Sequence, residues 1–349
     1  MPPSVLMLGW GFPPNISGGL DTFVGSLFWE FDDRDDVDVE LVLPAEFAPD
    51  DVAAIHGIPT GDGDVIERIE RLSEEFVERA ADADVVHTHD WFGYDPGVES
   101  QSTHDVQWMT TFHSLTQDRN LNPPDYEVET EQRIADRADS LVAVSDLTAG
   151  RVSEFYGRDA DVVHNGFQRV EPTGRDVKDE LGIDGPMLFF VGRHTHQKGI
   201  THLLYAMSKL RRPEVTLVLG GSGHLTAQLE RFAELLGVDD QVEFVGYVPD
   251  AELADYYASA DAFVSASLAE PFGMTVVEAL STGTPVVTTE CGAAEVLPDD
   301  CLVLVDSHSD AIADGIDAAL AMDGVPDFEE RTWTDVADDY VALYESLLA

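Results

Sequence analysis

Two glutamates, Glu270 and Glu278, lie on either side of an expected helix start in the stretch EPFGMTVVEALSTG. The first belongs to a Pro-Phe-Gly turn, and the second follows eight positions later inside an apolar run. The spacing alone means little, because Glu67 and Glu75 repeat it in a segment without other signs of chemistry. The setting is informative, since the N-terminus of a helix attracts anions such as phosphate. The stretch therefore predicts an anion bound near Gly273, within reach of Glu278, as in a nucleotide-sugar site.

A second candidate is the loop VGRHTHQKG, in which Arg193 and Lys198 follow an apolar segment and lie five positions apart. Lysine is nearly absent from this chain, whose other two lysines are Lys178 and Lys209. A lysine in a glycine-bounded loop is therefore an informative exception. Two cations at the end of a strand could hold a diphosphate leaving group. The alternative is an ordinary solvated turn.

Paired glycines form the third candidate, in the segment GFPPNISGGLDTF that follows the first apolar run. Gly18 and Gly19 precede an expected helix, so their backbone amides could approach an anion closely. The segment is neither a G-x-G-x-x-G fingerprint nor a P-loop with its lysine. A flexible connection explains the same residues equally well.

Two polar residues come directly after apolar runs in the first half of the chain. Asp90 is the fourth residue of HTHDW and His113 ends TTFH, and both are placed to meet a polar ligand at the edge of a sheet. Structural capping is the alternative for each of them. Ser145, which precedes the segment DLTAGRVSEFYG, is expected to be the N-cap of a helix.

The histidine pairs HTH at 87–89 and at 194–196 have the spacing of metal ligands. A zinc site needs three or four convergent ligands, and neither pair supplies them locally. The Asp-x-Asp pairs of the chain are expected by chance in so acidic a sequence. No metal site is therefore predicted.

Short apolar runs alternate with amphipathic segments along the whole chain, and this alternation predicts parallel sheets covered by helices. The expected strands are VLMLGW, VELVLP, DVVHTHD, WMTTFHS, SLVAVSD, MLFFVGR, VTLVLGG, VEFVGYV, AFVSAS and TPVVTT. We expect an α/β protein with two doubly wound, Rossmann-like domains that face each other across a cleft. In such sheets ligands bind at the carboxyl ends of the strands. The expected domains are residues 1–167, residues 168–332 and a final amphipathic helix, residues 333–349, that returns to the first domain.

The chain has 349 residues, of which 68 are acidic and 19 basic, for a formal net charge of −49. Repulsion of this size destabilises a compact state in dilute buffer and is screened at molar salt. We infer a halophilic, archaeal type of protein, and the acidity argues against nucleic acid as a partner. No apolar run reaches the length of a membrane span. With two cysteines and no basic leader, the chain is expected to be cytoplasmic.

Taken together, these segments resemble the retaining GT-B glycosyltransferases of family 4, with features of glycogen and starch synthases. The resemblance extends over almost the whole chain in the family's order. The matching segments are GG at 18–19, DVVHTHDW, TTFHS, RADSLVAVS, VVHNGF, GRHTHQKG, GSGH, VEFVGYV, EPFGMTVVEALSTGTPVV and the closing W…Y pattern. One such motif is weak, whereas many in register are specific.

The resemblance implies a role for each matching residue. Arg193 and Lys198 would bind the donor diphosphate and neutralise it as it leaves, without a metal ion or other cofactor. Glu270 would contact hydroxyls of the donor sugar, and Glu278 those of the ribose. His113 would meet the sugar near the reacting carbon. His113, Arg193, Lys198 and Glu270 are thus the expected catalytic residues.

The remaining implied roles concern donor binding. Asp90 would line the sugar site, and residues 246–250 would flank the base. Backbone amides would assist at the diphosphate, namely those of Gly18, Gly19, Gly273, Met274 and Thr275. The partners implied are a nucleotide diphosphate sugar and a hydroxyl acceptor, which is a glycan, a lipid-linked sugar or a small molecule.

Departures from the family pattern leave alternatives open. Glycogen synthases have a longer first domain and often lack the second glutamate, whereas this chain is short and has Glu278. Glucan elongation therefore stays an alternative to transfer onto another hydroxyl. A nucleotide-sugar epimerase and a non-catalytic nucleotide-sugar binder are the other two. The sugar, the base, the acceptor and the oligomeric state are not specified by the sequence.

Overall fold

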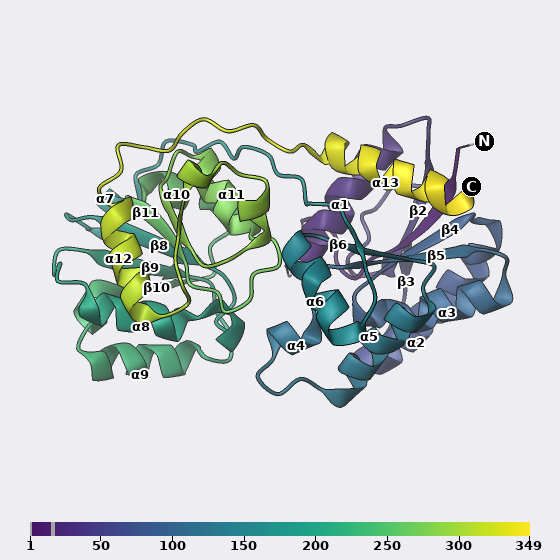
Figure 1. Cartoon of the computed structure of the whole chain (residues 1–349), viewed down its shortest axis with the longest axis horizontal. Coiled ribbons are helices and arrows are strands. Elements are labelled where there is room, and N and C mark those ends of the chain that lie inside the picture. The colour runs from purple at the N-terminus through teal and green to yellow at the C-terminus, as the bar shows by residue number, and fades with distance from the viewer. Residues whose placement is uncertain (1, 15–17) are drawn as a thin grey trace. The chain divides into compact units, whose positions relative to one another are not determined.

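The computed structural model describes residues 2–14 and 18–349, which divide into two compact units. Unit 1 comprises Met1–Gln117, Asn122–Gly166 and Arg331–Ala349, and unit 2 comprises Asp118–Leu121 and Phe167–Glu330. The sequence predicted domain boundaries after residues 167 and 332. In the structure the chain passes from unit 1 to unit 2 after Gly166 and returns to unit 1 after Glu330. Each unit contains one parallel sheet covered by helices (Figure 1).

The sheet of unit 1 has seven strands in the order β3-β2-β1-β4-β5-β6-β7, and all its neighbouring strands are parallel. Its strands are β1 (Ser4–Leu8), β2 (Asp38–Pro44), β3 (Ile55–Ile58), β4 (Val85–His89), β5 (Gln107–Phe112), β6 (Ser140–Ala143) and β7 (Asp161–Val162). Its helices are α1 (Gly19–Asp32), α2 (Val65–Arg79), α3 (Tyr94–Thr103), α5 (Asp125–Arg137), α6 (Asp146–Tyr156) and α13 (Trp333–Leu348), while the short α4 (Thr116–Arg119) lies at the unit boundary.

The sheet of unit 2 has six parallel strands in the order β10-β9-β8-β11-β12-β13. Its strands are β8 (Met187–Val191), β9 (Thr216–Gly220), β10 (Val242–Gly246), β11 (Ala262–Ser265), β12 (Val286–Thr288) and β13 (Leu302–Leu304). Its helices are α7 (Val177–Leu181), α8 (Ile200–Lys209), α9 (Thr226–Leu236), α10 (Asp250–Ser259), α11 (Met274–Ser281) and α12 (Ser309–Ala319). Two doubly wound parallel sheets were predicted, and both are confirmed.

The strand order identifies where a ligand fits in each unit. Successive strands are added toward one edge of the sheet before, and toward the other edge after, the junction of β1 and β4 in unit 1 and of β8 and β11 in unit 2. Parallel sheets bind ligands at such switch points, outside the carboxyl ends of the strands. The predicted residue Asp90 directly follows β4, Arg193 follows β8, and Glu270 lies in the loop after β11.

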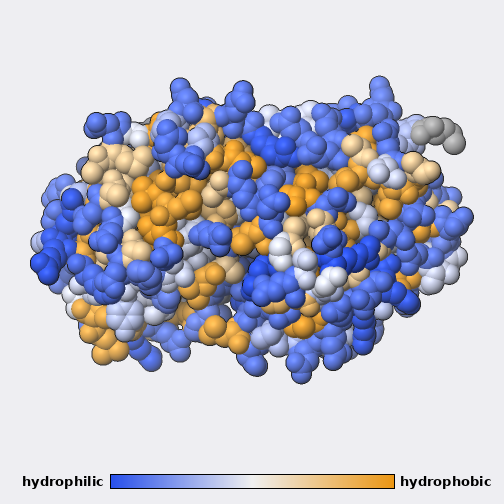
Figure 2. All heavy atoms as spheres, viewed as in Figure 1, coloured by the Kyte–Doolittle hydropathy of each residue, from blue (hydrophilic) through white to orange (hydrophobic). Residues whose placement is uncertain are grey.

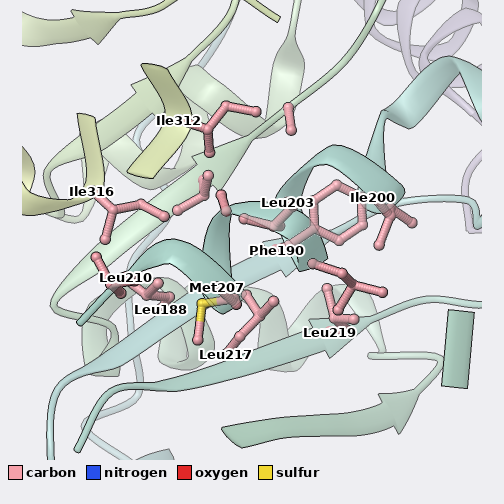
Figure 3. Packing of buried hydrophobic residues seen from close by; sticks show 14 of the residues in the cluster. Leu188, Phe190, Ile200, Leu203, Met207, Leu210, Leu217, Leu219, Ile312 and Ile316 are labelled. Carbon is pink, nitrogen blue, oxygen red and sulfur yellow. The ribbon is translucent and has the colours of Figure 1, made fainter. Parts of the chain in front are cut away.

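One hydrophobic core of unit 2 lies between its sheet and the helices α8 and α12. Figure 3 shows Leu188, Phe190, Leu217 and Leu219 of β8 and β9 packed with Ile200, Leu203, Met207, Ile312 and Ile316 of the two helices. Leu203 is fully buried, and truncation of such a leucine to alanine typically costs about 2–5 kcal/mol. This packing fixes the position of α8, whose first residue, Ile200, follows the loop that carries Lys198.

Helix α13 completes unit 1, where it lies along α1 (Figure 1). Its start is a capping box, in which the Thr332 side chain accepts from the backbone of Asp335 and the Asp335 carboxylate accepts from that of Thr332. Tyr340 and Tyr344 are fully buried on its inner face. The Tyr344 hydroxyl reaches Nδ1 of His87 at 2.7 Å, so α13 is bonded to the sheet of unit 1.

Hydrophilic side chains are spread over much of the face in view in Figure 2, in keeping with 68 acidic residues in the chain. None of the helices within residues 2–14 and 18–349 combines the length and the apolar composition that a bilayer crossing requires.

Candidate active site

The loop after β8 is held against its neighbours by close approaches that only glycine permits. A Cβ atom on Gly221 would lie 2.0 Å from the carbonyl oxygen of Gly192. Gly199 has a φ of 60°, and a Cβ atom there would lie 1.8 Å from the carbonyl oxygen of Ala266. The chain can therefore fold the loop from Gly192 to Gly199 tightly against the residues that follow β9 and β11.

This close fit brings Lys198 to Glu270. The Lys198 Nζ atom lies 2.7 Å from Oε2 of Glu270, and the Ser267 hydroxyl donates to the same oxygen at 2.7 Å. Glu270 is 7% exposed, so its carboxylate depends on these two donors. The pair places one cation and one carboxylate together at the switch point of unit 2.

Arg193 lies in the same loop and is exposed. Its guanidinium makes no ion pair or hydrogen bond with any residue in the ranges 2–14 and 18–349. Lys178 and Lys209, in contrast, each form an ion pair with an aspartate. Lys178 lies 2.9 Å from Asp261, and Lys209 lies 2.7 Å from Asp310. In so acidic a chain, an arginine without a carboxylate partner is available for a bound anion.

Helix α11 begins where the sequence predicted, with Gly273 as its N-cap at a φ of 98°. The left-handed conformation favours glycine at this position. The first turn of α11, which includes Met274 and Thr275, contains no acidic side chain, and Gly273 provides no side-chain cap. The partial positive charge of the helix start is therefore not offset by a carboxylate within this turn.

Glu278 lies in the second turn of α11 and is half-buried. The hydroxyl of Tyr257, from α10, donates to Oε2 of Glu278 at 2.7 Å. Burial raises the pKa of Glu278, and the bond from Tyr257 acts in the opposite direction. The Thr284 hydroxyl donates in turn to the carbonyl of Tyr257 at 2.6 Å. Glu278 is thus a carboxylate of restricted orientation.

In unit 1, the side chain of Asp90 is hydrogen-bonded to the main chain of His113. Oδ1 of Asp90 accepts from the backbone N–H of His113 at 2.8 Å and from that of Ser114 at 3.4 Å. Asp90 itself has a φ of 47°, which is unusual for a residue other than glycine. Strained backbone of this kind often occurs at functional sites. Asp90 therefore positions the strand end that carries His113.

The paired glycines lie at the start of α1, where Gly18 is the N-cap and Gly19 the first helical residue. Gly18 has a φ of 176°, which any residue adopts. A Cβ atom on either glycine would meet no described atom within 4 Å. Packing and conformation within the described chain therefore do not require glycine at these two positions. The open space beside them could hold a ligand. The neighbouring residues 15–17 of the predicted loop lie outside the described residues.

The histidine pairs serve as hydrogen-bonding groups. His87 contacts Tyr344 through Nδ1 and Thr111 through Nε2, at 2.7 and 2.8 Å. Nδ1 of His194 lies 2.9 Å from the Thr226 hydroxyl. Ser145 is the N-cap of α6, as predicted, and accepts from the backbone of Thr148.

Two residues of the site, Ser267 and Tyr257, were not found from the sequence, and His89 was considered there only as a member of a metal-ligand pair. Ser267 and Tyr257 hold the two glutamates, and His89 contacts the ring of His113 at 3.2 Å. Ser267 ends the expected strand AFVSAS. The one feature of the sequence that could have indicated it is a polar residue at the end of a strand. Nothing local distinguishes Tyr257 from Tyr256 beside it.

Two family models match the chain. One, Glycosyl transferases group 1, matches residues 175–332, and the other, Glycosyltransferase Family 4, matches residues 17–169. A D-inositol 3-phosphate glycosyltransferase of Mycolicibacterium smegmatis is 30% identical over 76% of this chain and 68% of its own length. The chain belongs to the group 1 glycosyltransferases. It is therefore a transferase enzyme, as the sequence predicted.

Two further similarities concern the whole length of this glycosyltransferase. An uncharacterized glycosyltransferase of Methanocaldococcus jannaschii is 27% identical over 98% of this chain and 97% of its own. The crystal structure of Anabaena HepE in complex with UDP-glucose covers 99% of this chain and 95% of its own, with a TM-score of 0.72 and 20% identity. The fold is thus that of the GT-B glycosyltransferases.

Proposed function

We propose that this glycosyltransferase moves a sugar from a nucleotide diphosphate sugar to a hydroxyl acceptor, with retention of the anomeric configuration and without a metal ion. The observation that carries the proposal is the pair of Lys198 and Glu270 at the switch point of unit 2, with Arg193 in the same loop. A cationic loop beside a carboxylate matches a donor with an anionic half and a hydroxyl-rich half. HepE, a fold neighbour, was crystallised with UDP-glucose, which supports a nucleotide-sugar donor.

The diphosphate half of the donor is assigned to Arg193, Lys198 and the start of α11. Fixed cations and backbone N–H groups stabilise the charge that develops on a leaving group, typically by about 3–4 kcal/mol per donor. Because Arg193 and Lys198 supply this charge from side chains, the reaction does not require a divalent ion. The amides of Gly273, Met274 and Thr275 contribute at the positive end of the helix, and those of Gly18 and Gly19 are assigned the same task.

The carboxylates are assigned to hydroxyl groups. Glu270 accepts from hydroxyls of the donor sugar while Lys198 holds its carboxylate in place. Glu278 accepts from the ribose hydroxyls, with Tyr257 restricting its orientation. Tyr247 is 72% exposed after β10, in the segment assigned to the base, and offers a ring on which a base can stack.

The residues of unit 1 are assigned to the sugar. His113 donates to or accepts from a sugar oxygen near the reacting carbon, and Asp90 holds the His113 backbone. Retention follows when the acceptor oxygen attacks the anomeric carbon on the face from which the diphosphate leaves. The bond from that carbon to the β-phosphate oxygen breaks, the bond to the acceptor oxygen forms, and the acceptor proton passes to the leaving diphosphate.

The cellular setting is also a proposal. The net charge of −49 supports a halophilic protein that works at molar salt, where self-repulsion is screened. The two cysteines, Cys291 and Cys301, are unpaired and buried, which fits a reducing cytoplasm.

The test is a panel of nucleotide sugars at molar potassium chloride, with binding followed by saturation-transfer NMR and turnover by release of the nucleoside diphosphate. Proton NMR of the product gives its anomeric configuration. Turnover measured with and without a chelator shows whether a metal ion is required. Epimerised donor without acceptor would indicate an epimerase, elongated glucan a glycogen-synthase-type enzyme, and binding without turnover a binding protein.

A matched pair of variants tests the assignment of the diphosphate site. Lys198→Ala should lower turnover at least about a hundredfold, whereas Lys209→Ala, which removes an exposed lysine from the end of α8, should leave turnover unchanged. Wild-type turnover in the Lys198→Ala variant would overturn the assignment.

A further inference from the structure

Three histidine rings follow one another through the interior of unit 1. The ring centroids of His87 and His89 on β4 are 4.5 Å apart, and those of His89 and His113 are 5.2 Å apart. His87 and His89 are fully buried, and His113 is 9% exposed. Nδ1 of His89 lies 3.2 Å from Nε2 of His113, which is hydrogen-bonding distance. His89 is thus the buried neighbour through which the ring of His113 is connected to the sheet.

The hydrogen between these two rings belongs to only one of them. A neutral imidazole has one N–H and one acceptor nitrogen, and burial keeps the pKa of His89 well below its usual range, so His89 is neutral. Either His89 donates from Nδ1 to Nε2 of His113, or His113 donates from Nε2 to Nδ1 of His89. The two arrangements differ in what remains at the other nitrogen of His89.

That other nitrogen, Nε2 of His89, is buried without a hydrogen-bond partner in the part of the chain that the structure describes. If His113 donated, the hydrogen of His89 would be on Nε2, as a buried N–H without an acceptor. If His89 donates, Nε2 has only a lone pair. Buried N–H groups without an acceptor are rarer in folded proteins than acceptors without a donor. The first arrangement, with His89 as the donor, is therefore favoured.

We propose that His89 is a positioning residue, which donates from Nδ1 to Nε2 of His113 and thereby holds His113 with its hydrogen on Nδ1. The His113 ring is also fixed by Phe23 of α1, whose ring meets it edge to face at 4.5 Å. The backbone of His113 is fixed by Asp90 at 2.8 Å. Ring, tautomer and main chain are thus set by three different elements.

The consequence for the reaction rests on the function proposed above. A ligand oxygen that meets Nδ1 of His113 finds a hydrogen-bond donor. His113 then acts on the sugar by donating to an oxygen, and it does not remove a proton from the acceptor hydroxyl. This agrees with a reaction in which the leaving diphosphate takes up that proton.

The direct test is the tautomer of His113 in the intact protein, by two-dimensional 15N–1H NMR of the imidazole groups at molar potassium chloride. The His113 signals are assigned by their loss in His113→Gln. The pattern of an Nδ1–H ring is expected for His113 in the wild-type protein, without ligand. An Nε2–H pattern would overturn the proposal, and this experiment needs neither activity nor a substituted His89.

A matched pair of substitutions at His89 then separates the hydrogen bond from packing. Asparagine and leucine have nearly the same shape, but only the asparagine amide can donate at the position of Nδ1. His89→Asn should keep the Nδ1–H pattern of His113, and His89→Leu should lose it. The same pattern in His89→Leu as in wild type would show that His89 does not set the tautomer and would overturn the proposal.

Kinetics provide the second readout. With a donor identified in the nucleotide-sugar panel, His89→Leu should lower kcat/KM for that donor about tenfold relative to His89→Asn, the equivalent of one hydrogen bond. Equal kcat/KM in the two variants would overturn the positioning role. If no nucleotide sugar is turned over by wild type, the proposed function fails, whereas the NMR result still decides the tautomer.

Discussion

Lys198 and Glu270 form a partly buried ion pair of 2.7 Å between the loops that follow β8 and β11. The Lys198 side chain is 21% exposed and that of Glu270 is 9% exposed. Because the Glu270 carboxylate is shielded from water, its stability in the folded state depends on Lys198. The function proposed above assigns both residues to turnover as well. Their effects on stability and on turnover can therefore be separated by substituting both.

The first prediction concerns this pair. Lys198→Met leaves the Glu270 carboxylate with the Ser267 hydroxyl as its one remaining donor among the described residues. The loss of one member of a fully buried pair typically costs about 3–5 kcal/mol, and this partly buried pair should cost less than that. Adding Glu270→Gln removes the buried charge and should restore most of the lost free energy of unfolding. Chemical denaturation measures this free energy.

Turnover should respond differently. The double variant Lys198→Met/Glu270→Gln should stay inactive, since it lacks both the cation and the carboxylate. Recovery of turnover along with stability would mean that the pair is only structural.

The second prediction concerns Arg193, which is exposed. Arg193→Ala should change the free energy of unfolding by less than about 0.5 kcal/mol, as exposed substitutions usually do. Turnover of a nucleotide sugar should fall at least about a hundredfold, because a group on the leaving diphosphate is lost.

Arg212→Ala is the matched control for Arg193, since Arg212 is a surface arginine of the same unit and pairs with Asp317. Its turnover should equal that of the wild type. An equal loss in both variants would point to a general effect of positive charge.

The third prediction uses the bond from Tyr257 to Glu278. Burial raises the pKa of Glu278, and the hydroxyl of Tyr257 lowers it by favouring the carboxylate. Tyr257→Phe removes that donor, so the pKa of Glu278 should rise further. If the carboxylate binds the ribose, the acidic limb of a plot of donor affinity against pH should move to higher pH in Tyr257→Phe.

The control for Tyr257 is its neighbour. Tyr256 is also buried and packs on Phe189, but it makes no hydrogen bond to Glu278. Tyr256→Phe should leave the acidic limb where it is in the wild type. A displaced limb in Tyr256→Phe and an unmoved one in Tyr257→Phe would contradict the role given to Tyr257.

The fourth prediction concerns stability in acid. Burial lowers the pKa of His87 to about 3 and that of His89 well below its usual value, whereas unfolded histidines titrate near 6.5. Between these values the unfolded state binds protons that the folded state does not. Stability is therefore complete above about pH 6.5 and falls with decreasing pH, by about 1.4 kcal/mol per pH unit for each histidine.

Tryptophan fluorescence can follow this loss in unit 1 alone, because all five tryptophans belong to that unit. His87→Phe should reduce the slope of unfolding free energy against pH by about 1.4 kcal/mol per unit between pH 6 and pH 4. His224→Gln, which changes an exposed histidine of unit 2, should leave the slope unchanged. Equal slopes in wild type and His87→Phe would contradict the prediction.

The fifth prediction concerns salt. With a net charge of −49, repulsion between carboxylates opposes folding in dilute buffer. Raising potassium chloride from 0.1 M to 1 M shortens the Debye length from about 10 Å to about 3 Å, so Tm should rise. Thermal unfolding followed by circular dichroism measures it, and a Tm that is independent of salt would contradict the inferred halophilic character.

Most of the fold could be predicted because its strands are apolar runs bounded by polar segments. The central strands β1, β4, β8 and β11 are of this kind and were all expected. Three strands were not expected: β3, β7 and β13. They are short and lie at sheet edges, where fewer side chains are buried and the hydrophobic pattern is weaker.

The sequence by itself determined the class of fold and the loops in which chemistry is expected. Alternation of strands and helices is a local pattern, and Asp90, Arg193 and Gly273 follow from their places at strand ends and at a helix start. These features depend on neighbouring residues, so they can be read without knowledge of the folded chain.

Only the tertiary structure decided which side chains act together. Lys198 contacts Glu270 across 72 positions, His89 contacts His113 across 24, and Tyr257 contacts Glu278 across 21. Each bond joins separate elements of one unit, and its existence depends on sheet order and helix packing. No local pattern specifies such pairs, because the residues become neighbours only when the parallel strands are assembled.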